Sequence, residues 1–502
     1  MPEGSPPSVN KAPLSDKKPK RLSPARKAAW EVGILARKRS AFVQEVIASN
    51  IDASAMTPAD KAFATRLALG VAATWGTLDE LIDRFLDSPE GLQAEVRDAL
   101  RISCYEMLFL GKSPHAAVDQ GVELVRSVTH RATGLANAVL RKIAAAKKDF
   151  PFGDPAHDLA ALARLHAFPL WLASLLVHEL GWQKAASFME ASNQPPPIYL
   201  AVNPLKCDED EVIALFDRLQ IPYAPFAAPY GTIPGCLRLL DPHALRHRQL
   251  ARLFDEGKVL VSDAASQMVA ALALPVQNPA SFLEIGAGRG TKTILLQGNA
   301  LRRFGNQMSL SILDSHHFKV RMTQERSVAY GVRIDHAFTL DATLPLELSE
   351  GLGGLRYDAV LVDAPCSGLG TLRRHPEIRW KLTPEAIASV AAVQEAMLAQ
   401  AAALVAPGGM LTYSTCTVGA LENEGQVGRF MKSEAGKAFR LLPVSGKACF
   451  STCPSPDPGT GPGLDPCPGT GSDPCPGTGA DPGPARNNGP GPDPGRDPEG
   501  IP

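Results

Sequence analysis

The chain has 502 residues, of which 45% are apolar, so it is too long for one compact core and two or three domains are expected. Because 51 Lys and Arg balance 52 Asp and Glu, the net charge neither predicts nor excludes a polyanionic partner. Apolar stretches such as Leu170–Val177 are shorter than the roughly 20 residues of a membrane-spanning helix, and the polar N-terminus lacks a secretory core. A cytoplasmic protein without a membrane partner is therefore predicted, with its nine cysteines as reduced thiols.

The first part of the chain is expected to form a tail and a helical bundle. Residues 1–25 are rich in Pro, Ser and Lys and lack helical periodicity, which predicts a disordered basic arm. Residues 26–147 have apolar residues at three- and four-residue spacing, as in LQAEVRDALRISCYEMLFL, which predicts an all-α domain. Its candidate RNA contacts are the basic residues Arg131, Arg141 and Lys142.

Two α/β domains are expected to follow. Between residues 150 and 255 the helical pattern of FPLWLASLLVHEL, the strand PIYLAVNP and the helical CDEDEVIALFDRL predict a small α/β linker domain. Between residues 256 and 445, helices alternate with the apolar strands SFLEIG, MSLSILD, RIDHAFTLD, YDAVLVD and GMLTYST. This alternation is typical of a parallel, doubly wound, Rossmann-like sheet.

The strand SFLEIG leads into a candidate cofactor loop. An acidic residue is followed there by glycines at alternate positions: Glu284, Gly286, Gly288 and Gly290. Glycines permit close approach to a ligand, and the next helix offers free N–H groups. A dinucleotide fingerprint would have its third glycine at Thr291, so an NAD site is disfavoured. Asp314 and Asp341 close the next two strands, where Asp314 could bind ribose hydroxyls.

Two cysteines are the candidate reactive groups. Cys366 follows Asp363 at the end of the fourth strand of this domain, and Cys416 follows the fifth. Since adjacent parallel strands end at one edge of a sheet, both thiols are expected near one ligand. One reaction that requires such a thiol is methylation of cytosine at carbon 5, which is a poor nucleophile. A thiolate that adds to carbon 6 would make carbon 5 nucleophilic, and Asp363 could assist by hydrogen bonding at the Watson–Crick edge of the base.

The segments DAPCSGLGTLRRHPEIRW and YSTCTVGALENE closely resemble the RNA 5-methylcytosine methyltransferases of the Sun and RsmB type. This resemblance implies S-adenosylmethionine as cofactor, Cys416 as the attacking nucleophile and Cys366 as the residue that assists release. It also places Lys292 near the cofactor or the target base, Asp341 near the adenine, and Asp363 among the cofactor-binding residues. The helical domain resembles the RNA-binding factor NusB, for example at GLANAVLR, and this domain order implies small-subunit ribosomal RNA as substrate.

A basic run follows the first cysteine motif. Its arginines are expected to contact RNA phosphates, and its tryptophan to stack on a base: Arg373, Arg374, Arg379 and Trp380. A solvated loop with a core tryptophan is the alternative. We expect no metal, and a monomer.

The chain departs from the family pattern at two places. The family loop usually reads AAPGGKT, whereas this chain has AGRGTKT, and we expect cofactor binding to be retained through Gly290 and Lys292. Residues 446–502 are predicted to be a low-complexity tail, with 15 Pro and 12 Gly after residue 450, in place of the last inner strand. A short, less stable sheet is therefore expected.

Two other functions compete with this interpretation. One is a non-enzymatic RNA-binding or ribosome-assembly protein derived from such a methyltransferase, which the intact Asp363, Cys366 and Cys416 disfavour. The other is a methyltransferase for protein or a small molecule, which would leave the second cysteine unexplained.

Overall fold

A computed structural model describes residues 22–228, 231–444 and 447–452 of the chain. Most of the predicted basic arm, and the Pro- and Gly-rich tail from residue 453 onward, lie outside these described residues.

The N-terminal part is the predicted helical bundle. Its α-helices are α1 (Pro24–Arg39), α2 (Val43–Ile47), α3 (Pro58–Asp83), α4 (Ala94–Leu108), α5 (Pro114–Val128) and α6 (Thr133–Ala146). Thr57 caps α3 by accepting a hydrogen bond from the backbone N–H of Asp60, and a proline follows at the first helical position.

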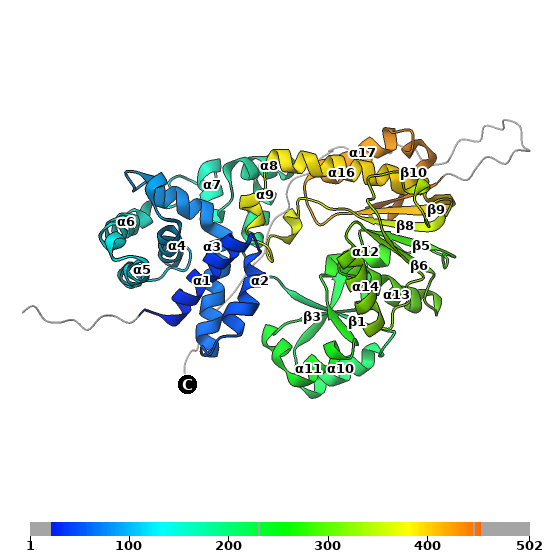
Figure 1. The fold of residues 1–502 in the computed structure, drawn as a ribbon, viewed down its shortest axis with the longest axis horizontal. Coiled ribbons are helices and arrows are strands. Elements are labelled where there is room, and N and C mark those ends of the chain that lie inside the picture. Colours follow the sequence, from blue (N-terminus) through cyan, green and yellow to red (C-terminus); the bar gives the residue numbers. More distant parts are fainter. Residues whose placement is uncertain (1–21, 229–230, 445–446, 453–502) are drawn as a thin grey trace, which may run out of the picture. The chain divides into compact units, whose positions relative to one another are not determined.

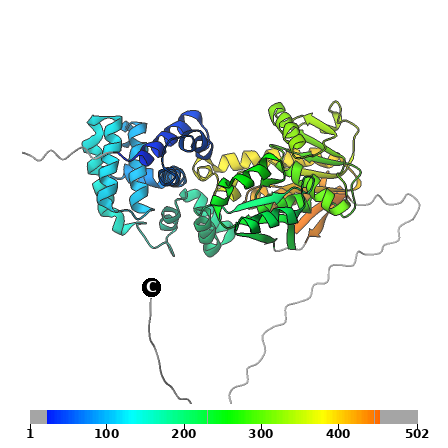
Figure 2. The same ribbon diagram turned by 90° about the horizontal axis from the view of Figure 1, so that it is seen from below.

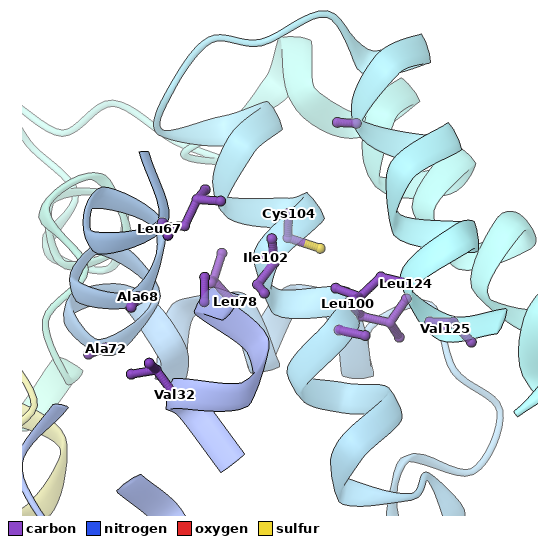
Figure 3. Packing of buried hydrophobic residues seen from close by; sticks show 14 of the residues in the cluster. Val32, Leu67, Ala68, Ala72, Leu78, Leu100, Ile102, Cys104, Leu124 and Val125 are labelled. Atoms are coloured by element: carbon purple, nitrogen blue, oxygen red, sulfur yellow. The ribbon is translucent and has the colours of Figure 1, made fainter. Parts of the chain in front are cut away.

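Apolar stripes at helical spacing hold this bundle together. Leu67 of α3, Leu100 of α4 and Leu124 of α5 are fully buried in one hydrophobic cluster (Figure 3). Figure 2 shows the blue and cyan helices of the bundle lying side by side. An ion pair adds to the packing, because Arg26 donates two hydrogen bonds of 2.8 and 2.6 Å to the fully buried Glu106.

A small α/β region follows. Its elements are α7 (Leu159–His166), α8 (Leu170–Leu180), α9 (Trp182–Ser192), β1 (Ile198–Val202), α10 (Glu209–Arg218), β2 (Tyr223–Ala228), β3 (Gly231–Leu239), α11 (Arg248–Asp255) and β4 (Val259–Val261). The strands form an antiparallel sheet in the order β2-β3-β1-β4. Strand β4 pairs with β1, so the small α/β region extends beyond the predicted boundary at residue 255. A strand of three residues has too short a sequence pattern to be predicted.

The third part is the doubly wound sheet. Its strands are β5 (Phe282–Ile285), β6 (Leu310–Asp314), β7 (His336–Thr339), β8 (Tyr357–Asp363), β9 (Val405–Ser414), β10 (Phe439–Val444) and β11 (Lys447–Thr452). Their order is β10-β11-β9-β8-β5-β6-β7, with β5 to β9 parallel, so the five predicted strands are confirmed.

Helices cover both faces of this sheet (Figure 1). One face packs against α12 (Ala264–Leu272), α13 (Thr291–Phe304) and α14 (His317–Ala329), and the other against α16 (Pro384–Ala403) and α17 (Glu424–Lys432). The buried strands consequently read as continuous apolar runs, since neither face meets solvent.

The expected loss of the last inner strand is wrong. Strand β11 (Lys447–Thr452) lies between β9 and β10 and pairs antiparallel with both. The sequence KACFST contains no proline and precedes the repeats, so it can form a ladder that the later Pro-rich segments cannot. The low-complexity tail therefore begins after this strand and not at residue 446.

Helix α16 is a long apolar element that the sequence reading overlooked. By length and composition it could cross a membrane, as could the bent pair α7 and α8 if taken as one span. In the structure, Met397, Leu398 and Ala401 of α16 are buried in the core beside the sheet. Helices in the core of a folded domain can also be as long and as apolar as a membrane-spanning helix.

Candidate active site

The glycine loop between β5 and α13 has the geometry of a ligand cradle. Gly286, Gly288 and Gly290 have φ values of +86°, +58° and +75°, which side chains rarely tolerate. A Cβ at Gly286 would lie 2.3 Å from the carbonyl oxygen of Asp363, so no other residue fits there. The N-terminus of α13 has no side-chain cap at Gly290, and its N–H groups remain available to a ligand.

Two of the predicted acidic cofactor residues, Glu284 and Asp314, form hydrogen bonds with the glycine loop or with the helix that follows it. Glu284 is fully buried and accepts a 2.6 Å hydrogen bond from Thr293, so it braces α13 instead of facing a ligand directly. Burial raises the pKa of Glu284 to about 8. Asp314 accepts a 3.1 Å hydrogen bond from the N–H of Gly288 and lies 3.7 Å from Lys319.

Asp341 lies two residues beyond the end of β7. Its carboxylate accepts hydrogen bonds of 2.9 and 2.7 Å from the backbone N–H and the hydroxyl of Thr343. These bonds hold the pKa of Asp341 below its ordinary value. The side chain is exposed and shapes a turn at the sheet edge.

Asp363 joins the cofactor loop to the reactive edge of the sheet. Its Oδ2 atom is 2.6 Å from Nζ of Lys292, and its Oδ1 accepts a 3.0 Å hydrogen bond from Ser414. Ser414 ends β9 and was missed by the sequence reading, because a serine in YSTCT carries no distinctive signal. The arrangement fixes one carboxylate between α13 and the two cysteine segments.

The structure brings the two predicted cysteines together. The Sγ atoms of Cys366 and Cys416 are 3.0 Å apart, although the residues are 50 positions apart in the chain. The backbone N–H of Cys416 also donates to Sγ of Cys366 at 3.2 Å. Strands β8 and β9 are parallel and adjacent, which confirms the reasoning from strand ends.

The two thiols have different electrostatic environments. A hydrogen bond from Cys366 lowers the pKa of Cys416 below its ordinary value, and the nearby Lys292 acts in the same direction. The same hydrogen bond raises the pKa of Cys366, and burial raises it further. Cys416 is exposed whereas Cys366 is half-buried. The two thiols are therefore not equivalent, because the exposed Cys416 has the lowered pKa and the half-buried Cys366 has the raised one.

A buried carboxylate ties the two cysteine segments together. Glu422 is fully buried, and its Oε1 accepts hydrogen bonds from the N–H of Ser367 at 2.8 Å and from Gln394 at 3.0 Å. Its Oε2 accepts from the hydroxyl of Ser367 at 2.5 Å. Glu422 was not among the predicted site residues, because sequence alone does not distinguish a buried glutamate from a solvated one.

The predicted RNA contacts of the basic run divide into two groups. Arg373 and Arg374 are exposed, and Arg374 pairs with Asp263. Arg379 is fully buried, so the prediction that it contacts phosphates is wrong. It donates to the side chain of Asn193 at 2.8 Å, and burial lowers its pKa to about 9.

Trp380 has a structural position as well. Its Nε1 donates to the carbonyl oxygen of Ala73 in α3 at 2.9 Å, and its ring packs on Gly76. These contacts favour a structural role for Trp380, whose ring is half-buried, and stacking on a base stays a prediction. On the bundle, Arg131, Arg141 and Lys142 are exposed. Within the described ranges, no group of three or more His, Cys, Asp or Glu residues could hold a metal ion.

This fold and site define a class of protein: a Rossmann-like methyltransferase domain preceded by a helical bundle and a small α/β region. The sequence profile of the 16S rRNA methyltransferase RsmB/F family matches residues 271–451. The NusB family matches residues 23–145, and the ferredoxin-like domain of RsmF/B-like methyltransferases matches residues 168–246.

Similar proteins lead to the same family. A probable ribosomal RNA small subunit methyltransferase B from Synechocystis is 30% identical over 81% of this chain and 89% of its own. One from Bacillus subtilis is 28% identical over 81% and 88%. The crystal structure of PH0851 shares the fold, with a TM-score of 0.66 and 23% identity over 85% of this chain and 93% of that one. The chain belongs to the RsmB/F methyltransferase family.

Proposed function

We propose that this protein transfers a methyl group from S-adenosylmethionine to carbon 5 of a cytosine in RNA, with small-subunit ribosomal RNA as substrate. The observation that carries the proposal is the pair of thiols 3.0 Å apart beside the carboxylate of Asp363. A substrate atom that is already nucleophilic attacks the methyl group directly and needs no thiol, whereas cytosine carbon 5 must first be activated.

The residues present fit S-adenosylmethionine. A glycine loop with positive φ angles, an uncapped helix N-terminus and the carboxylate of Asp314 lie at the carboxyl edge of β5 and β6. Asp341 lies at the same edge, and Glu284 supports the loop from within. When bound, the cofactor would supply an electrophilic methyl group to carbon 5.

Cys416 begins the reaction. Its thiolate adds to carbon 6 of the base, forming a carbon–sulfur bond and moving electron density to carbon 5. The ring needs a hydrogen-bonding partner at its Watson–Crick edge during this addition. Asp363, fixed by Lys292 and Ser414, takes that role.

Cys366 acts at the end of the reaction. Release requires that carbon 5 lose its proton to a base, and that the carbon–sulfur bond break to return a thiolate at Cys416. The thiol of Cys366 is already within hydrogen-bonding distance of that sulfur and stabilises the departing anion.

Trapping of the adduct tests this proposal. The C366A variant is expected to accumulate a denaturation-resistant complex with RNA, whereas C416A forms none. Cys207 is buried in the small α/β region, so C207S serves as the matched control and should behave as the unmodified protein. A non-enzymatic RNA-binding protein would form no adduct in any variant.

The identity of the substrate is tested separately. Bisulfite sequencing of RNA from a deletion strain should show one unmodified cytosine in small-subunit ribosomal RNA that regains its methyl group on complementation. Loss of a methyl group from transfer RNA alone would contradict the ribosomal assignment. The exposed Arg373, Arg374 and Arg141 are the arginines that we propose for phosphate contacts.

A further inference from the structure

A cavity lies near Cys366 and Cys416, and neither cysteine is part of its walls. It has a volume of about 330 Å³ and opens between the antiparallel sheet and the segment after Cys366. Its walls include two aromatic side chains, Tyr199 and Phe226, and two basic ones, Arg373 and Arg374, with Met268 and Thr371 beside them. The volume is at the lower end of the range for small-ligand sites. We call it the side cavity.

The side cavity is joined directly to the segment that holds the nucleophile. The N–H of Gly370, in its wall, donates a 3.0 Å hydrogen bond to the carbonyl oxygen of Cys416. A Cβ at Gly370 would lie 2.8 Å from that oxygen, so the two segments are as close as backbone permits. The cavity therefore has a wall segment that is bonded directly to the backbone of Cys416.

The aromatic wall suits a nucleobase. Tyr199 and Phe226 are half-buried, with ring centroids 5.2 Å apart and an interplanar angle of 79°. Such an edge-to-face pair presents a ring face beside a ring edge. Proteins that hold single-stranded RNA use aromatic faces of this kind to stack bases.

The basic wall suits a phosphate. Nε of Arg373 donates to the carbonyl oxygen of Ala191 at 2.7 Å, which fixes the side chain. Among the described residues, the two terminal nitrogens of Arg373 have no hydrogen-bonding partner. Arg374 is held by Asp263, whose other oxygen caps α12 through the N–H of Ala265. The wall thus has two guanidinium groups, Arg373 and Arg374, and one carboxylate, Asp263, which leaves a net positive charge.

We propose that the side cavity binds a nucleotide adjacent to the target cytidine in single-stranded RNA. Phe226 and Tyr199 hold its base, and Arg373 holds its phosphate. The inference rests on the proposed function and adds to it a subsite outside the thiol centre. A purely structural role is the competing explanation, because Tyr199, Phe226 and Met268 also pack on a small cluster around Ile233.

Steady-state kinetics on a synthetic RNA that spans the target separates these explanations. F226L keeps apolar volume but removes the stacking face, so KM for RNA should rise about 10-fold, with kcat within twofold and the melting temperature retained. Tyr223 lies on the same strand and packs on a different cluster, so Y223L is the matched control and should leave KM unchanged.

An abasic scan of the RNA identifies the occupant. One abasic position beside the target should raise KM of the unmodified protein about 10-fold and add nothing further in F226L. Unchanged KM in F226L, or effects that multiply at every position, would overturn the subsite while methylation by the unmodified protein still supported the proposed function. No methylation by the unmodified protein would overturn both.

Discussion

The buried carboxylate of Glu422 offers the sharpest test of how the two cysteine segments are positioned. In E422A, the N–H of Ser367 loses its acceptor, whereas the Ser367 hydroxyl still reaches Thr417 at 2.6 Å. Gln394 also retains a partner, the carbonyl oxygen of Pro365 at 2.8 Å. One orphaned donor and the vacated volume together should lower the free energy of unfolding by about 2 to 4 kcal/mol.

The catalytic effect of E422A should exceed its effect on stability. Ser367 is adjacent to Cys366, and a shift of about 1 Å at reacting groups can cost on the order of 100-fold in rate. We therefore expect kcat to fall by about that factor, with KM for S-adenosylmethionine unchanged because the glycine loop does not contact Glu422.

Thermal unfolding and methyl-transfer assays measure both quantities. E422Q keeps an acceptor for Ser367 and should lose only about 1 kcal/mol. Glu424 is exposed two residues away, so E424Q is the matched control. An E422A variant that melts and turns over like E424Q would refute this account of how the cysteines are held.

Three further outcomes follow from the pKa shifts and burial. Alkylation of Cys416, followed by peptide mass spectrometry, should begin at a lower pH than for an ordinary thiol, and C366A should move its midpoint upward because the donor is lost. Because the folded pKa of Glu284 is raised from 4.5 to about 8, its contribution to stability is lost as pH rises between these values, by about 1.4 kcal/mol per pH unit. E284Q should remove this slope from denaturant unfolding curves, and an unchanged slope would contradict the burial argument. R379M leaves buried carbonyl oxygens without a donor and should cost about 2 to 4 kcal/mol in the same assay, against about 0.5 kcal/mol or less for the exposed R373Q.

The position of the two cysteines could be predicted because the end of a buried strand is a local pattern in the sequence. A run such as YDAVLVDAPC shows where a buried strand stops, and parallel neighbours then bring Cys366 and Cys416 to one edge. The cofactor loop was recognisable for the same reason, since positive φ angles restrict its residues to glycine.

The burial of side chains in the basic run after Cys366 could not be predicted from local patterns. RRHPEIRW has the same composition whether it is solvated or inserted between domains, and burial of Arg379 depends on acceptors supplied by distant helices. Strand β11 was missed for a related reason: a six-residue strand before a Pro-rich tail has too little periodicity to be distinguished from that tail.

The segment that begins at Cys366 ends in the helical bundle, where Glu377 accepts a 2.7 Å hydrogen bond from the N–H of Val43 and Trp380 donates to Ala73. The catalytic domain is thus not a detachable module. Excising it would expose the tryptophan ring to water and remove two hydrogen bonds at the far end of the loop that carries Cys366. Exchange of the N-terminal domain between relatives would require this loop to be exchanged with it.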